Sequence, residues 1–395
     1  MKFLFTSGSR LLCLLAVLSW PGPGDCASPT PPSLEDTVAI GKRVADSQLF
    51  SGREWIMPTK EPRVWKNTEW GATALWVGVL EFYKLTQDKR YLDALMAMGK
   101  SANWQPQGHS FNADMHAIGQ IYLDIYALNP NPEMIAPIKS LMDEMSARKD
   151  APVLDNAQRG SKVWWSWSDS LFMSPPILFH LAQETGERKY FDYADKNWWL
   201  TVDQLYDPQE RLLYRDSTSK KESLQNGRKV FWARGDGWVF ASLARILPMI
   251  PKDAPSRPRY EKLFREMALR LTEIQQPEGF WTSSLLDHQS FPQGETSGTA
   301  FFCYGLAWGL NQGILQGQVY RQAAQRSWQW LRTQVQPDGV LIGVQPVGSA
   351  PAAFNPSTSE VYGVGAFLLA TCEMNRLLND PKAKPVRVSS TQFLH

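Results

Sequence analysis

The chain has 395 residues, and its 41 Lys and Arg residues nearly balance its 39 Asp and Glu residues, for a formal net charge of +2. This balance argues against nucleic acid or an acidic membrane surface as a partner. The five His and four Cys residues show no spacing typical of metal ligands, so no metal site is predicted. The 17 Trp residues exceed what a core of this size requires, and indole faces both fill cores and stack on sugar rings.

The first 27 residues are predicted to be a secretory signal peptide. Lys2 and Arg10 precede the apolar run 11–20, which is followed by Pro, Gly and small residues. This run has about half of the roughly 20 residues that a bilayer span requires, and no later segment is long and apolar enough. The sequence therefore predicts an exported protein without a membrane span, either periplasmic or secreted.

Residues 28–395 are predicted to form a single all-α domain with short disordered ends at 28–35 and 386–395. Apolar residues recur at helical spacing, and the alternation typical of strands is almost absent. The predicted helices cover residues 70–85, 89–100, 115–128, 175–184, 190–205, 238–246, 260–275, 299–313, 320–334 and 362–377. Cys303 and Cys372 lie inside such helical runs, where buried thiols are the simplest interpretation and a disulfide stays open.

Two weak internal repeats indicate an array of helical hairpins. Residues 86–93 resemble residues 185–192, each set lying between two predicted helices, and residues 276–279 resemble residues 336–339. A helix pair cannot bury its apolar face alone, and stacked neighbours make a continuous core. About six pairs fit between residues 70 and 377, which favours closure into a toroid over an open solenoid.

Polar clusters precede several of the predicted helices, and they contain Asp114, Asp169, Arg234 and Glu360. In a toroid of helical hairpins the inner helices all start at one end, so these clusters are expected to converge on one cleft. The alternative is that each cluster is an ordinary helix cap, because polar residues are common at helix starts.

Asp169 is the candidate catalytic acid, because it lies among Trp164, Trp165 and Trp167. Burial penalises the charged form of a carboxyl group, and an acid kept protonated near neutral pH can donate a proton. A neighbouring helix N-terminus would stabilise the anion by only about 0.3 to 1 kcal/mol, so burial is expected to dominate. A helix N-cap is the alternative role for this residue.

The segment 234–238 has two glycines around Asp236 at a predicted helix start. Glycines there cost backbone entropy without helping the helix, so something is expected to approach this backbone closely. Arg234 offers a planar fork for a carboxylate, and Trp238 offers a stacking face. An ion pair of Arg234 with Asp236 or with another internal acid is the alternative.

Five segments together resemble glycoside hydrolase families 105 and 88, the unsaturated rhamnogalacturonyl and unsaturated glucuronyl hydrolases, with the closer likeness to family 105. These segments are residues 113–120, 167–173, 232–238, 295–299 and 360–366, in family order. The resemblance implies an (α/α)6 barrel and release of a 4,5-unsaturated uronic acid from the non-reducing end of oligosaccharides made by polysaccharide lyases. It implies no metal and no other cofactor.

The resemblance also implies roles for single residues. Asp169 matches the general acid/base, and Asp114 matches the second carboxylate of the site. Asp169 would protonate C4 of the ring double bond and direct water to C5, after which the hemiketal collapses with loss of the aglycone. The candidate substrate-binding residues are Arg234, Trp238, Trp167, His116 and Glu360. The expected partner is an unsaturated oligosaccharide, bound by a monomer or a weak homo-oligomer.

The chain departs from better-studied relatives at positions expected to shape the aglycone side. Relatives have histidines upstream of the Asp169 motif and after the tyrosine that matches Tyr214, whereas this chain has residues 158–163 and Arg215 there. Met115 stands where some relatives have a second Asp. Arg159 and Arg215 are each expected either to contact an acidic neighbouring sugar or to lie on the solvated surface.

Other functions on the same fold remain as alternatives. These are a conventional inverting glycosidase, a polysaccharide lyase and a sugar epimerase, although an epimerase would need basic histidines in the cleft. A non-catalytic carbohydrate-binding protein would use the tryptophans and Arg234 without needing Asp169. Whether the uronic acid derives from galacturonic or glucuronic acid stays open.

Overall fold

The structure is a computed structural model of the chain, and it describes residues 34–58, 61–108, 111–149, 165–223 and 227–379. The predicted signal peptide at 1–27, the predicted tail at 386–395, Arg159 and Trp164 lie outside the described residues. The predicted lead-in at 28–35 is wrong at its end, because a helix begins at Leu34.

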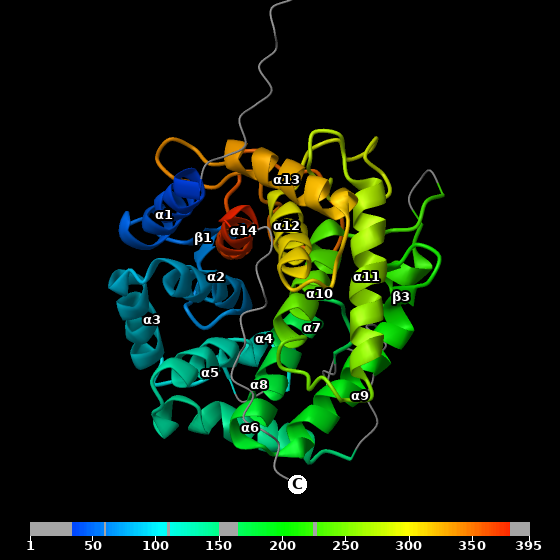
Figure 1. Ribbon diagram of the computed structural model, residues 1–395. Helices are drawn as coiled ribbons and strands as arrows, with labels where there is room; N and C mark the ends of the chain where they lie inside the picture. Colours follow the sequence, from blue (N-terminus) through cyan, green and yellow to red (C-terminus); the bar gives the residue numbers. More distant parts are fainter. Residues whose placement is uncertain (1–33, 59–60, 109–110, 150–164, 224–226, 380–395) are drawn as a thin grey trace, which may run out of the picture. The chain divides into compact units, whose positions relative to one another are not determined.

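Six helices of the described chain are buried along most of their length and form an inner layer (Figure 1). They are α2 (Trp70–Thr86), α5 (Gly119–Leu128), α8 (Pro175–Thr185), α10 (Ala233–Ile246), α12 (Thr296–Asn311) and α14 (Val361–Asn379). In α12, every residue except Leu310 is buried. A helix that is apolar all round belongs inside a core, which explains this layer.

Six amphipathic helices alternate with the inner ones along the chain and form an outer layer. They are α1 (Leu34–Phe50), α3 (Lys89–Ser101), α6 (Ala136–Ser146), α9 (Arg188–Leu205), α11 (Arg257–Ile274) and α13 (Gln318–Thr333). In α13 the buried residues are Ala323, Ala324, Ser327, Trp328 and Leu331, a stripe on one face of the helix. Such a stripe packs on the inner layer and leaves the other face to water.

The inner helices close into a ring. Each of them contacts the next in the order α2, α5, α8, α10, α12 and α14, and α14 contacts α2 again. The chain therefore has the predicted all-α, (α/α)6 barrel fold. Cys303 and Cys372 lie on α12 and α14, and both are buried free thiols.

Short helices and strands lie in several of the connections between the long helices. The predicted helix 115–128 is wrong in its extent, because it is divided into α4 (Ala113–His116) and α5. A second short helix, α7 (Ser170–Met173), precedes α8 in the same way. The other short elements are β1 (Ile56–Met57) with β2 (Arg63–Val64), β3 (Tyr206–Asp207) with β4 (Leu212–Leu213), η1 (Pro132–Met134) and η3 (Ser219–Lys221).

The first repeat marks the turns from an inner to an outer helix. Residues 86–93 join α2 to α3 and residues 185–192 join α8 to α9. In each turn one residue has a left-handed backbone, Gln87 with φ of 57° and Gly186 with φ of 71°. The expectation that the two segments are similar turns is confirmed.

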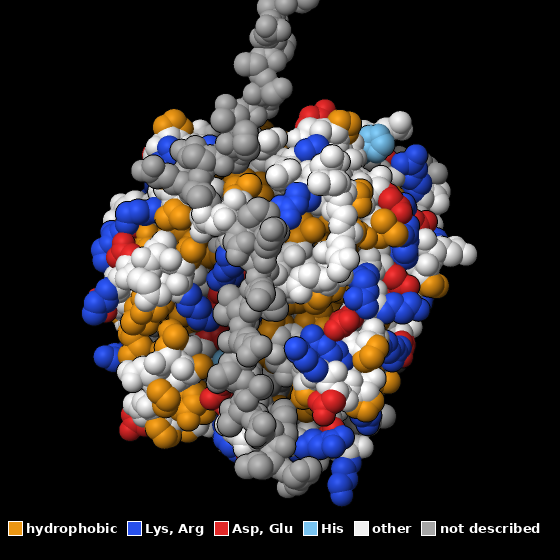
Figure 2. All heavy atoms as spheres, in the orientation of Figure 1, with side chains coloured by type: hydrophobic (Ala, Val, Ile, Leu, Met, Phe, Trp, Pro, Cys, Tyr) orange, Lys and Arg blue, Asp and Glu red, His pale blue; other side chains and the backbone are white. Residues whose placement is uncertain are grey.

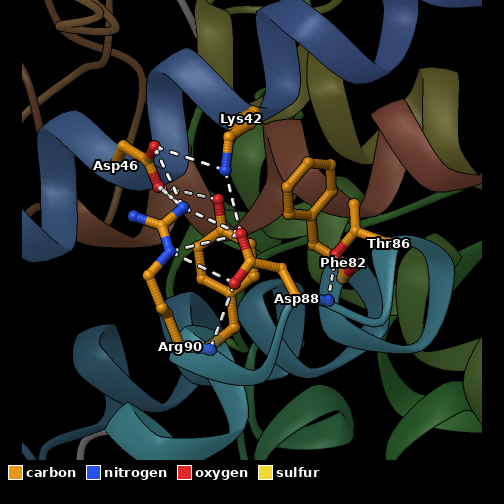
Figure 3. Close-up of polar contacts among 7 residues, drawn as sticks. Lys42, Asp46, Phe82, Thr86, Asp88 and Arg90 are labelled. Carbon is orange, nitrogen blue, oxygen red and sulfur yellow. Dashed lines mark hydrogen bonds and ion pairs between the residues drawn. The ribbon is translucent and has the colours of Figure 1, made fainter.

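The same repeat also joins neighbouring outer helices. The Tyr91 hydroxyl donates to Asp46 of α1 at 2.8 Å, and the Tyr190 hydroxyl donates to Asp143 of α6 at 2.5 Å. Figure 3 shows the first of these joints, where Lys42 and Arg90 point toward Asp46 and Asp88. These charges are exposed, so each pair contributes little energy, but their arrangement fixes the register of α1 against the α2–α3 turn.

The surface carries charges of both signs. On the face shown in Figure 2, basic and acidic side chains are interspersed, as the near-zero net charge suggests. Among the residues that the structure describes, no helix is both long enough and apolar enough to cross a membrane.

Candidate active site

The elements that precede the inner helices meet at one end of the barrel, and a pocket lies there. Asp114 from α4, Asp169 from the residue before α7 and Arg234 from the first turn of α10 all line it, together with Trp167. The expectation that polar clusters converge on one cleft is thus met for four of the seven predicted site residues. His116, Trp238 and Glu360 do not line this pocket.

Asp169 is buried but reachable from the pocket, with 9% of the residue exposed. It directly precedes α7 with a helical backbone, and its side chain makes no hydrogen bond that caps the helix. The N-cap alternative is therefore wrong for this residue. Its Oδ2 accepts a hydrogen bond from the Ser168 hydroxyl at 3.2 Å and lies 3.5 Å from Nε of Arg215.

The tryptophans near Asp169 do not act as one group. Trp167 shares the pocket with Asp169, whereas the Trp165 ring packs edge-on against Tyr193 of the outer helix α9. Besides Trp167, the pocket brings a guanidinium group, that of Arg215, to the same carboxyl.

Asp114 and His116 lie on the same short helix but face different surroundings. Asn112 begins α4 by accepting a hydrogen bond from the Asp114 backbone N–H, and the Asp114 side chain is partly exposed at the pocket. His116 is fully buried, and its Nε2 is hydrogen-bonded to the Ser174 hydroxyl at 2.8 Å. In this structure the His116 ring joins α4 to the residue before α8, and a role in substrate binding stays a prediction.

Arg234 is almost completely buried, and its guanidinium group is held by the protein on several sides. Nη1 and Nη2 donate to the backbone carbonyls of Gln345 and Pro346 at 2.6 and 2.8 Å. The guanidinium also lies over the rings of Trp232 and Tyr362, at 4.4 and 4.8 Å from their centroids. The alternative of an ion pair with Asp236 is wrong, because no such contact forms.

The glycines around Asp236 have a packing role. α10 begins at Ala233, so Arg234 to Gly237 form its first turn, five residues earlier than predicted. A Cβ atom on Gly235 would lie 3.2 Å from the Ser168 hydroxyl oxygen, and one on Gly237 would lie 3.2 Å from Cβ of Phe301. The close approach predicted for this backbone is therefore made by the Asp169 segment and by α12.

Trp238 is fully buried inside the ring of inner helices. Its ring lies 4.8 Å from Phe172, 4.5 Å from Phe301 and 6.2 Å from Trp70, measured between centroids. Of this aromatic cluster only Trp70 lines the pocket, and a contact of Trp238 with a sugar stays a prediction. Trp238 supports the pocket from behind, through Trp70.

Glu360 is buried next to Arg234 and lies behind the pocket. Its Oε2 accepts a hydrogen bond from Nε1 of Trp65 at 3.0 Å. Burial raises the pKa of Glu360 to about 7, although the Trp65 hydrogen bond and the Arg234 charge oppose this shift. Glu360 lines a second pocket, which also contains residues of α1 and α14, and its contact with substrate stays a prediction.

Two functional elements were not assigned from the sequence. Arg215 lines the pocket beside Asp169, so of the two roles left open for it the solvated surface is wrong. Its signal was the departure from the relatives after Tyr214. The loop 345–348, which holds Arg234 and borders the pocket at Val347 and Gly348, carries no motif that would have shown it. No group of three or more His, Cys, Asp or Glu residues positioned for a metal ion occurs within the described ranges.

Comparisons with known proteins agree with this fold. The chain is 36% identical over 320 residues to an unsaturated 3S-rhamnoglycuronyl hydrolase of Formosa agariphila, covering 78% of this chain and 85% of that protein. A solved structure of a family 88 glycosyl hydrolase from Bacteroides vulgatus superposes with a TM-score of 0.77 at 29% identity, over 87% of this chain and 99% of that one.

A second solved structure, described as a polysaccharide lyase, has a TM-score of 0.78 and 32% identity over 88% of this chain and 99% of its own. The family model that matches describes one of the two families in the sequence resemblance, and it spans most of the described residues. Because residues 42–378 match the model of Glycosyl Hydrolase Family 88, the chain belongs to this family of glycoside hydrolases.

Proposed function

We propose that this enzyme removes a 4,5-unsaturated uronic acid from the non-reducing end of lyase-generated oligosaccharides. The observation that carries the proposal is the pocket that brings Asp169 and Asp114 together with two guanidinium groups, those of Arg215 and Arg234. Two carboxylates suit a reaction in which positive charge develops on a sugar ring, and guanidinium groups suit an acidic sugar. The activity of the Formosa agariphila relative supports this substrate class.

The reaction begins with a proton transfer. The acid form of Asp169 donates its proton to C4, and the electrons of the C4=C5 bond form the new C4–H bond. The cation left at C5 is stabilised by the ring oxygen and by the nearby Asp114 carboxylate. Water then adds to C5, and its proton returns to Asp169, which acts first as an acid and then as a base.

The hydrated product breaks down by itself. The C5 hydroxyl becomes a ketone as the bond between C5 and the ring oxygen breaks, and the ring oxygen takes up a proton. The hemiacetal at C1 then releases the aglycone as an alcohol and leaves an aldehyde. One water molecule is consumed in total, and Asp169 ends in its starting protonation state.

An unsaturated disaccharide tests the proposal directly. The conjugated double bond absorbs in the near ultraviolet, so hydration abolishes the absorbance. The relative from Formosa agariphila makes a uronic acid linked to rhamnose the first substrate to test. A panel of lyase digests of galacturonate and glucuronate polymers would identify the preferred uronic acid, and persistent absorbance in every digest would contradict the proposal.

A polysaccharide lyase is the second candidate, because one solved structure at 32% identity is described as such an enzyme. A lyase creates the double bond that the proposed hydrolase removes. With an intact uronic acid polymer as substrate, a lyase raises the absorbance and the proposed hydrolase leaves it unchanged. A carbohydrate-binding protein would change the absorbance of neither substrate.

Replacing Asp169 tests the catalytic acid. Asp169→Asn keeps the shape of the side chain but removes its titratable proton, so turnover is expected to fall at least about 100-fold. The matched control is Asp338→Asn, which removes a carboxylate paired with Arg53 on the surface and should leave turnover unchanged. Near-normal turnover of the Asp169 variant in steady-state assays would show that another residue supplies the proton.

Export is also part of the proposal. It is supported by the predicted signal peptide at residues 1–27. Expression of the full chain in a bacterial host, followed by mass spectrometry of the periplasmic and extracellular protein, is expected to find an N-terminus near residue 28. A protein retained in the cytoplasm with its leader intact would contradict export.

A further inference from the structure

Arg215 is tied to the Asp169 segment by the backbone. Its carbonyl oxygen accepts a hydrogen bond from the Ser168 N–H at 2.8 Å, and Trp167 and Asp216 are bridged in antiparallel fashion. The side chain is only 11% exposed and lies on the pocket wall with Asp114 and Asp169. The position of its guanidinium group relative to Asp169 is therefore built into the fold.

One side of the Arg215 guanidinium is firmly held. Its Nη1 donates to Oδ2 of Asp216 at 2.7 Å. The other oxygen of Asp216 accepts the backbone N–H groups of Thr218 and Ser219, both at 2.9 Å. Burial opposes the charge of Asp216, but these N–H groups and Arg215 keep its pKa below the ordinary value. Asp216 therefore remains an anionic anchor for Arg215.

The other side of the guanidinium is loosely held. Its Nε is buried and lies 3.5 Å from Oδ2 of Asp169, yet it makes no hydrogen bond within the described part of the chain. Arg234, by contrast, already donates two short hydrogen bonds to backbone carbonyls. The buried Nε–H of Arg215 is thus a hydrogen-bond donor whose nearest partner, the Asp169 carboxyl, lies at ion-pair distance only.

We propose that Arg215 makes the pocket specific for acidic sugars. On substrate binding, its guanidinium group exchanges its contact with Asp169 for the carboxylate of the unsaturated sugar. This inference rests on the proposed function. In the free enzyme the guanidinium stabilises the Asp169 anion. When the sugar carboxylate binds to Nε, it neutralises that cation and adds a negative charge beside Asp169. Both effects favour the protonated form of Asp169 that the first step requires.

The proposal makes substrate binding and acid activation one event. A neutral sugar would leave the positive charge of Arg215 beside Asp169, where it opposes protonation of that carboxyl. The carboxylate of an acidic sugar removes this opposition. The enzyme is thereby expected to discriminate by charge in turnover as well as in binding.

The test compares an unsaturated disaccharide with its methyl ester, in the wild type and in Arg215→Gln. The ester is neutral but also differs in the reactivity of its double bond, and the Gln variant measures that intrinsic difference. The ratio of kcat/KM for acid over ester is expected to fall at least about 10-fold in the variant, as for loss of a charge-assisted hydrogen bond. The matched control is Arg211→Gln, which removes the nearby surface pair with Glu273 and should keep the wild-type ratio.

The pH profiles give a readout that a purely structural role would not change. The profile of kcat/KM reports the free enzyme and that of kcat reports the complex. In the wild type, the fall in kcat at high pH is expected at least about one pH unit above the fall in kcat/KM. In Arg215→Gln the gap between the two falls should narrow, because the charge of Arg215 no longer changes on binding.

The outcomes separate this inference from the proposed function. If the wild type leaves the absorbance of both substrates unchanged, the proposed function is wrong. A wild type that consumes the acid, with an unchanged acid-to-ester ratio and an unchanged pH gap in Arg215→Gln, overturns only the role of Arg215. Should the Gln variant not fold, Arg215→Lys keeps the charge beside Asp216 without Nε. Its ratio is expected to fall at least about threefold, and an unchanged ratio again overturns the role.

Discussion

At the scale of single residues, Asp236 is a buried carboxyl close to Asp169, the proposed catalytic acid. Its Oδ1 accepts the Leu213 backbone N–H at 2.8 Å, and its Oδ2 has no hydrogen-bond partner among the described residues. Burial raises the pKa of Asp236 well above its ordinary value, and the charge of Asp169 adds to this shift. Asp236 therefore stays neutral at ordinary pH.

Asp236→Asn tests this assignment. An amide has the shape of the neutral carboxyl and can still accept the Leu213 N–H, so turnover is expected to stay within about threefold of the wild type and stability within about 1 kcal/mol. Steady-state rates and urea unfolding are the measurements. A loss of turnover like that of Asp169→Asn would mean that Asp236 takes part in the proton transfer.

The pocket residues differ in how far the sequence could predict them. Asp114, Asp169 and Arg234 belong to recognisable segments, and all three line the pocket. His116 and Trp238 belong to the same segments but point into the barrel. Their direction depends on where a helix begins: α10 starts at Ala233, so Trp238 falls on the face that packs against Phe301. Sequence patterns locate helix ends only to within a few residues, which is too coarse to orient a side chain.

At the scale of elements, the two related turns adopt one backbone with different residues. Gln87 and Gly186 both have positive φ, and both are exposed after the last residue of an inner helix. Glycine reaches this conformation without the steric cost that a side chain brings. Gly186 therefore suits its turn better than Gln87 suits the corresponding one.

Exchanging the two residues gives a matched pair of predictions. Gln87→Gly is expected to raise the free energy of unfolding by about 0.5 to 1 kcal/mol, and Gly186→Gln to lower it by a similar amount. Nothing lies within 4 Å of a Cβ atom added at Gly186, so the backbone conformation alone decides the result. Denaturant midpoints measured on both variants check these two changes in stability. A shift of both midpoints in the same direction would contradict the prediction.

Helices with continuous apolar periodicity were predicted close to their true bounds, as α2, α8 and α14 show. α1 and α6 were missed. α1 buries only a thin stripe that includes Thr37, Ile40 and Val44, so its apolar signal is weak. α6 follows two prolines, and Pro137 lies in its first turn, where proline is tolerated although it also marks breaks.

At the scale of the whole molecule, buried charges join the inner helices at the end away from the pocket. Asp124 of α5 lies 3.3 Å from Nδ1 of His180 on α8 and 3.1 Å from Nη2 of Arg245 on α10. Burial opposes the charges, but the Asp124 and Glu184 contacts raise the pKa of His180. This raised pKa adds stability below the ordinary His value, and the stability is lost as pH rises through the folded-state pKa.

Glu360 gives the whole fold a second pH dependence. Its pKa is raised to about 7 from an ordinary value of 4.5, so its contribution to the unfolding free energy is present below pH 4.5 and lost as pH rises to about 7. The loss is on the order of 3 kcal/mol. Glu360→Gln keeps an acceptor for Trp65 but cannot ionise, so its advantage over the wild type is expected to grow over this pH range. Urea unfolding at pH 4.5 and 7.5 measures this advantage. The same difference in unfolding free energy at both pH values would contradict a raised pKa of Glu360.

The ring closes only where α14 meets α2, and this contact joins parts of the chain made at very different times. The faces of α1, α2 and α12 that α14 covers have no other partner in the ring until Val361–Asn379 packs against them. A chain that stops before α14 therefore keeps a broad apolar surface exposed, and such a surface favours aggregation.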